Sequence, residues 1–447
     1  MYRLKIKDEK NRYELTELAK MFVSADELDT FTEGPDCFCV PGADEMDRNA
    51  QKRALYAYMA EHTGKALSWG TLTGVRPLKL FNKLVRQSGS TSGAEDLLKT
   101  EYLVSPGKIA LLKSVWDTQS RIAFNRDPKA VGVYIGIPFC PTRCLYCSFT
   151  SNKYTREKSE AYLKALEQEI EAVKELFSRK GLYADSIYIG GGTPSSLQED
   201  QFQWLTQITA DSFLSSKTSE YTVECGRPDS ITEGKLASLV KSGCGRISIN
   251  PQSMQSKTLE LIGRAHRPED ITEAFAMAKA AGVKIINADL IAGLPSESPE
   301  DMADSLSKII DLGPQNITVH TLAVKRGSRL IEQDKDMSYN AGDAVSQMLE
   351  QSFASLKDAG YAPYYLYRQK HMTANMENTG WSLPGCESIY NIRIMEEDQT
   401  MIALGAGGVS KIYYPEEDRI ERVANVSNYE IYTERIREMI KRKEDAL

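Results

Sequence analysis

Six short apolar runs alternate with longer amphipathic segments in the middle of this chain, and this alternation constrains the fold more than any other feature. The runs occupy residues 131–137, 186–189, 221–224, 246–249, 283–290 and 316–321. Each run has the length and composition of a buried strand. The intervening segments have helical periodicity and occupy residues 157–180, 199–213, 233–241, 268–281 and 299–312. Strands and helices in this order predict an α/β fold, a partial parallel (β/α)6 barrel.

Two regions of different pattern flank the predicted barrel, which we place at residues 131–330. Residues 1–130 open with a strand-like stretch and continue mainly as helices, which predicts an N-terminal α+β accessory domain. Residues 331–447 mix a helical segment with an aromatic stretch and predict a smaller C-terminal α+β domain that covers the substrate. Within it, the charged segment 434–443 predicts a solvated terminal helix without a functional role.

The charge balance limits the possible partners. The chain has 55 Lys and Arg residues against 62 Asp and Glu residues, a net charge of -7, whereas nucleic-acid-binding proteins usually carry a basic surface. Its first residues lack the apolar core of a signal peptide, and no apolar run is long enough to cross a bilayer. We therefore expect a cytoplasmic protein that binds neither nucleic acid nor membrane.

Three cysteines, Cys140, Cys144 and Cys147, lie within eight residues directly after the first predicted barrel strand. Structural zinc takes four protein ligands, whereas three thiolates can hold three irons of a [4Fe-4S] cluster and leave the fourth iron open. The spacing alone also fits a zinc site whose fourth ligand lies elsewhere in the chain. Both interpretations stay open on the cysteines alone. The remaining cysteines predict no complete site, and Cys225, Cys244 and Cys386 predict small buried packing residues.

Two separated motifs carry a family resemblance. Residues 134–147 read YIGIPFCPTRCLYC, and residues 190–194 read GGGTP. Together they resemble the radical S-adenosylmethionine (SAM) enzymes. Within that superfamily, residues 131–411 are similar to the oxygen-independent coproporphyrinogen III oxidases, and among these to the HemZ branch.

The resemblance implies a radical SAM barrel and two cofactors. It assigns a [4Fe-4S] cluster, and with it the catalytic centre, to Cys140, Cys144 and Cys147. It also implies that one or two SAM molecules bind in the barrel. The residues that it assigns to SAM are Tyr134, Tyr146, Gly191, Gly192, Thr193, Glu224, Gln252, Arg264, Asp289 and Ala323.

The chemistry of these residues suits that assignment. Glu224 can accept an ammonium group, and Arg264 can bind a carboxylate through two parallel hydrogen bonds. Because most of them follow predicted strands, we expect them to face one mouth of the barrel. Taken singly, each also fits a surface ion pair or a strand cap, and the glycines also fit a tight turn between strand and helix.

The implied reaction is the oxidative decarboxylation of two propionates of coproporphyrinogen III to vinyl groups, which gives protoporphyrinogen IX for haem biosynthesis. Such an enzyme needs a low-potential electron donor such as flavodoxin or ferredoxin. The tetrapyrrole substrate carries four carboxylates, so basic side chains should line its pocket. We identify Arg368 and Lys370 as candidates, and weaker ones are Arg76, Lys79, Lys325, Arg326 and Arg329. Any of these groups also fits a solvated face.

One departure from the family pattern affects the substrate. The oxidases carry a fourth cysteine two residues after the third, where this chain has Ser148-Phe149. Relatives with Phe there include haem-handling proteins. Two alternatives therefore stay beside the oxidase: a haem-binding chaperone or carrier that retains the cluster, and a radical SAM enzyme acting on another tetrapyrrole. In a haem carrier, His266 and His371 could be ligands, although a hydrogen-bonded structural role fits each of them as well.

Overall fold

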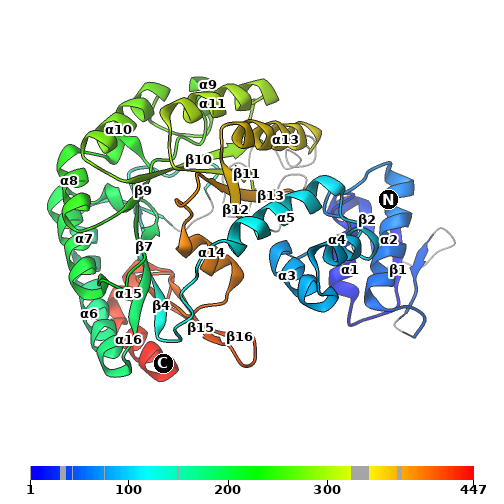
Figure 1. The fold of residues 1–447 in the computed structure, drawn as a ribbon, viewed down its shortest axis with the longest axis horizontal. Coiled ribbons are helices and arrows are strands. Elements are labelled where there is room, and N and C mark those ends of the chain that lie inside the picture. The colour runs from blue at the N-terminus through cyan, green and yellow to red at the C-terminus, as the bar shows by residue number, and fades with distance from the viewer. Residues whose placement is uncertain are drawn as a thin grey trace.

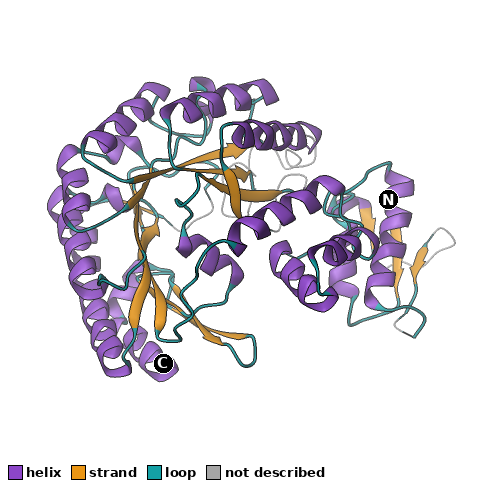
Figure 2. Ribbon diagram, in the orientation of Figure 1, coloured by secondary structure: helices purple, strands orange, loops and turns teal. Residues whose placement is uncertain are grey.

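The computed structural model describes residues 2–30, 37–42, 44–74, 76–147, 151–323, 342–369 and 375–447. Its centre is an 11-stranded sheet in the order β12-β13-β11-β10-β9-β8-β7-β4-β14-β15-β16. Figure 1 shows the sheet curving, with an arc of helices on its convex side and α14 (Ile389–Glu396) on its concave side. In Figure 2 the same separation is seen between the purple outer arc and the orange strands.

The six predicted strands are present and parallel. They are β4 (Ala130–Ile137), β7 (Tyr183–Gly191), β8 (Glu220–Glu224), β9 (Arg246–Ser248), β10 (Ile285–Ala292) and β11 (Asn316–Thr321). The helices that follow them are α6 (Arg156–Lys180), α7 (Glu199–Phe213), α8 (Glu233–Lys241), α9 (Ser256–Leu261), α10 (Pro268–Ala280) and α11 (Pro299–Leu312). The predicted mixed α/β fold with a parallel sheet is therefore confirmed. Within the described residues the sheet does not close, because its two edge strands, β12 and β16, do not pair with each other.

The C-terminal region extends this sheet at both edges. On one side, β13 (Glu377–Ser382) pairs antiparallel with β11, and β12 (Ala362–Arg368) pairs with β13. On the other side, β14 (Met401–Leu404) is a seventh parallel strand on β4 that the sequence did not predict, and β15 (Val409–Tyr414) and β16 (Arg419–Ala424) follow it. The remaining helices are α13 (Gly342–Asp358), α15 (Tyr429–Glu434) and α16 (Ile436–Ala446). The predicted domain boundaries at residues 130 and 330 stay predictions.

The terminal helix α16 corrects one prediction. Its residue Lys443 is only 2% exposed, and its ammonium lies 2.7 Å from a carboxylate oxygen of the fully buried Glu169 in α6. Met439 is also buried. The prediction of a merely solvated tail was wrong, because charge density along a helix does not reveal which charge turns inward.

The N-terminal region is α+β, as predicted. It combines a small parallel sheet of β1 (Tyr2–Ile6), β2 (Leu28–Asp29) and β3 (Phe38–Val40) with helices α1 (Arg12–Ala19), α2 (Arg48–Thr63), α3 (Pro77–Ser88), α4 (Thr91–Thr100) and α5 (Pro106–Ser120). Buried contacts join this region to the main sheet. Glu377 of β13 accepts hydrogen bonds from the Trp69 indole at 2.7 Å and from the Lys108 ammonium at 2.5 Å.

Side chains alternate across the parallel strands and so divide the sheet into two faces. Apolar residues such as Ile135, Ile187 and Val223 belong to the main hydrophobic core. Their neighbours along the strands are polar, for example Tyr134, Tyr188 and Glu224, and we refer to the concave space that they line as the lumen. No helix in the described ranges is long and apolar enough to span a bilayer.

Candidate active site

The cysteine loop leaves the carboxyl end of β4 and is anchored at several points. Cys140 ends the short strand β5 (Phe139–Cys140), which pairs with β6 (Asn152–Lys153). Its carbonyl accepts the Tyr154 N–H at 3.0 Å, and the Leu145 N–H donates to Ile262 O at 3.0 Å. Backbone hydrogen bonds thus fix the loop, while Cys140 and Cys147 stay half-buried and Cys144 is buried.

Two of the three thiols receive side-chain donors from neighbouring segments. The Thr193 hydroxyl lies 3.4 Å from the sulfur of Cys140, and Arg227 Nη1 lies 3.8 Å from the sulfur of Cys144. Donors to sulfur stabilise the thiolate relative to the thiol, and the thiolate is the form that binds iron. Sequence reasoning missed Arg227, because only the folded chain brings the segment after β8 against the cysteine loop.

The donor set fits a cluster better than a single ion. In the part of the chain that is described, no three His, Cys, Asp or Glu side chains gather closely enough to hold one metal ion. Sulfur ligands of one zinc lie about 3.8 Å apart, since Zn–S bonds of about 2.3 Å point to the corners of a tetrahedron. The thiolates of a cubane each bind a different iron and stand farther apart.

The glycine run packs against the cysteine loop. The Gly192 N–H donates to Ile137 O and the Thr193 N–H to Phe139 O, each at 2.7 Å. A Cβ on Gly192 would lie 2.5 Å from Phe139 O, and Gly191 has a φ of +111°. The tight-turn interpretation therefore has direct structural support, while the assignment of Gly191, Gly192 and Thr193 to SAM stays a prediction.

Glu224, at the end of β8, faces the lumen, and its carboxylate accepts a hydrogen bond from Tyr188. Burial raises the pKa of Glu224 to about 7; the hydrogen bond from the Tyr188 hydroxyl, 2.6 Å away, opposes that rise, and the nearby Asp289 adds to it. The ring of Tyr188 stacks on Tyr390 with centroids 4.3 Å apart, and Tyr134 lies parallel at 6.2 Å from Tyr188. Burial also raises the pKa of Tyr134. Sequence reasoning missed Tyr188 and Tyr390, although the alternation along β7 could have identified Tyr188.

Asp289, on β10, is held in its ionised state. Burial would raise its pKa, but hydrogen bonds and charge from His320, with smaller help from Asn287 and Thr318, outweigh burial and lower it. His320 Nε2 lies 3.6 Å from Asp289, and the Asn287 amide donates to Asp289 at 2.7 Å. The lumen therefore holds one carboxylate that stays charged and a second, Glu224, that titrates near neutrality.

Of the remaining predicted SAM residues, Gln252 and Ala323 follow strands, Arg264 follows α9, and Tyr146 lies in the cysteine loop. Gln252 has a left-handed backbone with φ of 67°, and its N–H donates to Asp289 O at 2.9 Å. Arg264 donates to the carbonyls of Gly226 and Asn250 at 3.3 and 3.2 Å. Tyr146 hydrogen-bonds Arg264, although burial still raises the pKa of Tyr146. Ala323 follows β11 and is half-buried.

Several buried polar atoms of the lumen and its rim have no hydrogen-bond partner among the described residues. They are Ser186 Oγ, Ser248 Oγ, Asn250 Oδ1 and Arg264 Nε. Since buried polar groups are normally paired, the unpaired atoms fit a polar ligand in the lumen.

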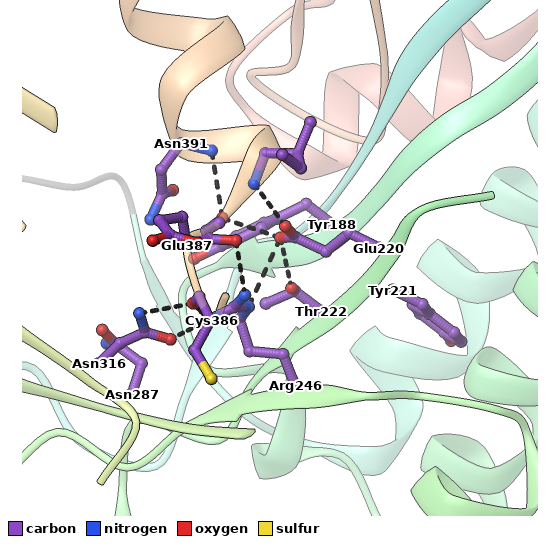
Figure 3. A network of polar contacts seen from close by, with 12 residues as sticks. Tyr188, Glu220, Tyr221, Thr222, Arg246, Asn287, Asn316, Cys386, Glu387 and Asn391 are labelled. Carbon is purple, nitrogen blue, oxygen red and sulfur yellow. Dashed lines mark hydrogen bonds and ion pairs between the residues drawn. The ribbon is translucent and has the colours of Figure 1, made fainter. Parts of the chain in front are cut away.

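At the amino-terminal ends of the strands, Arg246 donates to the carbonyls of Cys386 and Glu387 at 3.0 and 3.1 Å and contacts Asn316, as Figure 3 shows.

The predicted substrate residues lie apart from this arrangement or outside the described part. Arg368 is buried and donates to Leu72 O at 2.6 Å and to Asn375 O at 2.9 and 3.1 Å, with Trp69 stacked at 5.3 Å. Its role toward a substrate stays a prediction. Arg76 and Lys79 pair with Glu397 and Asp418. Ser148, Phe149, Lys325, Arg326, Arg329, Lys370 and His371 lie outside the described residues.

Predictions for four other residues have definite outcomes. Cys225 and Cys244 are buried, as predicted, whereas Cys386 is half-buried and that prediction was wrong. The hydrogen-bonded role predicted for His266 was also wrong, because both of its ring nitrogens are buried without a partner among the described residues. Burial, with the charges of Arg264 and Arg227, lowers the pKa of His266 to about 4.

Comparison with known proteins gives consistent relatives. Residues 134–309 match the family model of the radical SAM superfamily. The chain is 41% identical to the oxygen-independent coproporphyrinogen-III oxidase-like protein HemZ of Bacillus subtilis, over 88% of this chain and 80% of that protein. It is 34% identical to the heme chaperone HemW of the same organism, over 43% of this chain and 50% of that protein. Coproporphyrinogen III oxidase (HemN) of Escherichia coli shares the fold, with a TM-score of 0.56 and 23% identity over 70% of each chain.

Proposed function

Because the chain belongs to the radical SAM superfamily and, within it, to the family of the coproporphyrinogen-III oxidase-like protein HemZ, we propose that it is a radical SAM enzyme that oxidatively decarboxylates two propionates of coproporphyrinogen III. The observation that carries this proposal is the cysteine loop at the carboxyl end of β4. Polar residues from the ends of β8, β9 and β10 surround the same edge of the sheet. A radical SAM site requires this combination of three thiolates beside a polar lumen.

Cys140, Cys144 and Cys147 would hold the [4Fe-4S] cluster, with Thr193 and Arg227 donating to two of the sulfurs. When bound, the cluster and SAM together supply a 5′-deoxyadenosyl radical, which can remove a hydrogen atom from an unactivated carbon. The protein has to receive electrons singly for this purpose, so a low-potential donor of the flavodoxin or ferredoxin class is part of the proposal.

Four residues would orient SAM. Glu224 would accept its ammonium, and a bound cation would favour the ionised form of a carboxyl group that otherwise titrates near 7. Arg264, whose Nε is unpaired, would bind the methionine carboxylate. Asp289 and Gln252 would accept the ribose hydroxyls. One SAM molecule suffices for this arrangement, and a second one stays a prediction from the resemblance.

The substrate would occupy the concave side of the sheet, where tyrosines offer flat surfaces. Tyr365 and Tyr367 of β12 are stacked with an angle of 8° between their rings; Tyr365 is buried, so the half-buried Tyr367 would offer the accessible ring. Aromatic faces of this kind suit a macrocycle. Each propionate would lose one hydrogen atom to the 5′-deoxyadenosyl radical and one electron to a one-electron acceptor, and would release CO2 to become a vinyl group. The walls of the lumen would exclude water during these steps.

Anaerobic turnover tests the proposal. The protein is reconstituted with iron and sulfide, reduced with dithionite and given SAM, with coproporphyrinogen III either present or omitted. We expect 5′-deoxyadenosine in both samples, and more of it together with CO2 when the porphyrinogen is present. A Cys144→Ala control should lose most of its iron and the brown absorbance. A reconstituted protein that cleaves no SAM would refute the proposal.

A second candidate function is a haem carrier that retains the cluster. It is favoured by the similarity to the heme chaperone HemW and by Ser148-Phe149 at the position where the oxidases carry a further cysteine. Under this alternative, the protein would bind haem tightly, and coproporphyrinogen III would neither release CO2 nor increase the yield of 5′-deoxyadenosine. A haem titration followed by optical spectroscopy therefore accompanies the turnover experiment.

A further inference from the structure

Arg227 is a buried cation whose orientation is fixed by two sets of contacts. Its Nε and Nη2 donate to the two carboxylate oxygens of Asp229, each at 2.9 Å. Its Nη1 donates to the Thr142 hydroxyl at 3.0 Å and reaches the sulfur of Cys144 at 3.8 Å. The fork to Asp229 sets the plane of the guanidinium, and that plane directs the remaining nitrogen at the cysteine loop.

The two charges of this pair are screened unequally. The Arg227 side chain is 4% exposed, whereas the Asp229 side chain is 32% exposed. Water therefore weakens the field of the carboxylate more than the field of the guanidinium. Since Cys144 is buried, its sulfur experiences a net positive potential from this pair.

Arg264 adds to that positive surrounding. Its guanidinium bonds the Gly226 carbonyl, one residue before Arg227, and the Asn250 carbonyl, while its Nε is unpaired. Since Arg264 also hydrogen-bonds Tyr146, two guanidinium groups lie beside one short segment of the cysteine loop. A purely structural explanation would account for the contact between Arg227 and Thr142, but it would not require a charge directed at sulfur.

We propose that Arg227 raises the reduction potential of the cluster that Cys140, Cys144 and Cys147 hold. The inference rests on the proposed function, because it presupposes that cluster. On reduction, one electron from a one-electron donor enters the cluster, and no bond breaks and no proton moves. A buried cation next to a ligating thiolate stabilises the added negative charge, as hydrogen bonds and local charge do in other iron–sulfur sites.

Potentiometric titration with dithionite, followed by electron paramagnetic resonance of the reduced cluster, measures this effect directly. We expect Arg227→Gln to lower the ratio of reduced to oxidised cluster at a fixed potential about tenfold, which is 59 mV for one electron. Arg227→Lys keeps the charge but loses the fork, so its shift should be smaller. Asp229→Asn removes the opposing charge and should shift the midpoint in the opposite direction.

Arg143→Gln is the matched control. It removes the same charge from the cysteine loop itself, next to Cys144 in the sequence, but Arg143 is solvent-exposed. Its shift should be less than a third of that of Arg227→Gln, because water screens an exposed charge. If Arg227→Gln holds less iron than wild type, the test rests on the other two variants. Arg227→Lys should then lower the midpoint potential, and Asp229→Asn should raise it.

The inference and the proposed function can fail separately. A wild-type protein without a reduced-cluster signal would overturn both. A wild-type protein that reduces its cluster and cleaves SAM, combined with unchanged midpoints in all Arg227 and Asp229 variants, would overturn the inference alone. An Arg143→Gln shift as large as that of Arg227→Gln would also overturn it, since burial would then have no influence.

Discussion

Replacing Lys443 with Met should destabilise the protein, because it leaves a buried carboxylate without its cation. Glu169 is fully buried, and besides Lys443 it accepts hydrogen bonds from the Gly405 N–H at 2.7 Å, the Tyr432 hydroxyl at 2.6 Å and the Asn425 amide at 2.9 Å. Breaking a buried ion pair by removing one partner costs about 3–5 kcal/mol. Three neutral donors remain, so we expect the lower end, about 3 kcal/mol.

For a chain of 447 residues roughly 1 °C of melting temperature corresponds to 1 kcal/mol, so the midpoint should fall by about 3 °C. Urea unfolding, monitored by circular dichroism, measures the same loss as a free energy.

A double-mutant cycle completes this experiment. Glu169→Gln alone should also destabilise, because Lys443 is then buried without its counter-charge, and the double variant should recover part of the loss. Lys441→Met, two residues earlier on the exposed side of the same helix, should leave the melting temperature unchanged. A Lys443→Met variant as stable as wild type would refute our account of the pair.

Three further predictions concern pH and the lumen. SAM affinity, measured by anaerobic calorimetry, should weaken as pH falls below about 7, because Glu224 then takes up a proton. The Glu224→Gln variant should bind SAM weakly, and its affinity should depend less on pH. Tyr188→Phe removes a hydrogen bond that lowers the pKa of Glu224, so it should move the same profile to higher pH; an unmoved profile would exclude that bond. His266 has a folded pKa near 4 against 6.5 for the free side chain, so the folded state resists protonation. Its own contribution to stability should fall by about 3 kcal/mol from pH 6.5 to 4, and urea titrations should find this loss as the difference between wild type and His266→Leu.

The strands and helices of the parallel core were predictable because both signals are local. A buried strand needs an unbroken apolar run, and its helix needs apolar residues at helical spacing, so the sequence located β11 and α7 with the bounds that the structure has. The strand β14 escaped prediction because it has four residues and pairs with β4 from far along the chain. Pairing at that separation depends on tertiary contacts that no window of sequence contains.

For the site, the sequence indicated which strand ends carry polar groups but not how those groups pair. The positions of Glu224 and Asp289 followed from the strand pattern. The hydrogen bond from Tyr188 and the contact from Arg227 depend on packing between separate elements. Lys443 shows the same limit in reverse, since its charge predicted exposure and its pairing with Glu169 explains burial.

The short helix α14 connects two parts of the molecule that are distant in sequence. Near its start, Tyr390 stacks on Tyr188 in the lumen, and Glu397, directly after its end, grips Arg76 of the N-terminal region through two hydrogen bonds. Eight residues of helix make a stiff rod of about 12 Å. A tilt of the N-terminal region would thus displace the ring of Tyr390, which stacks on Tyr188 beside Glu224. Cutting the chain at the start of the barrel would release one end of that rod, so an isolated barrel is a poor stand-in for the intact protein.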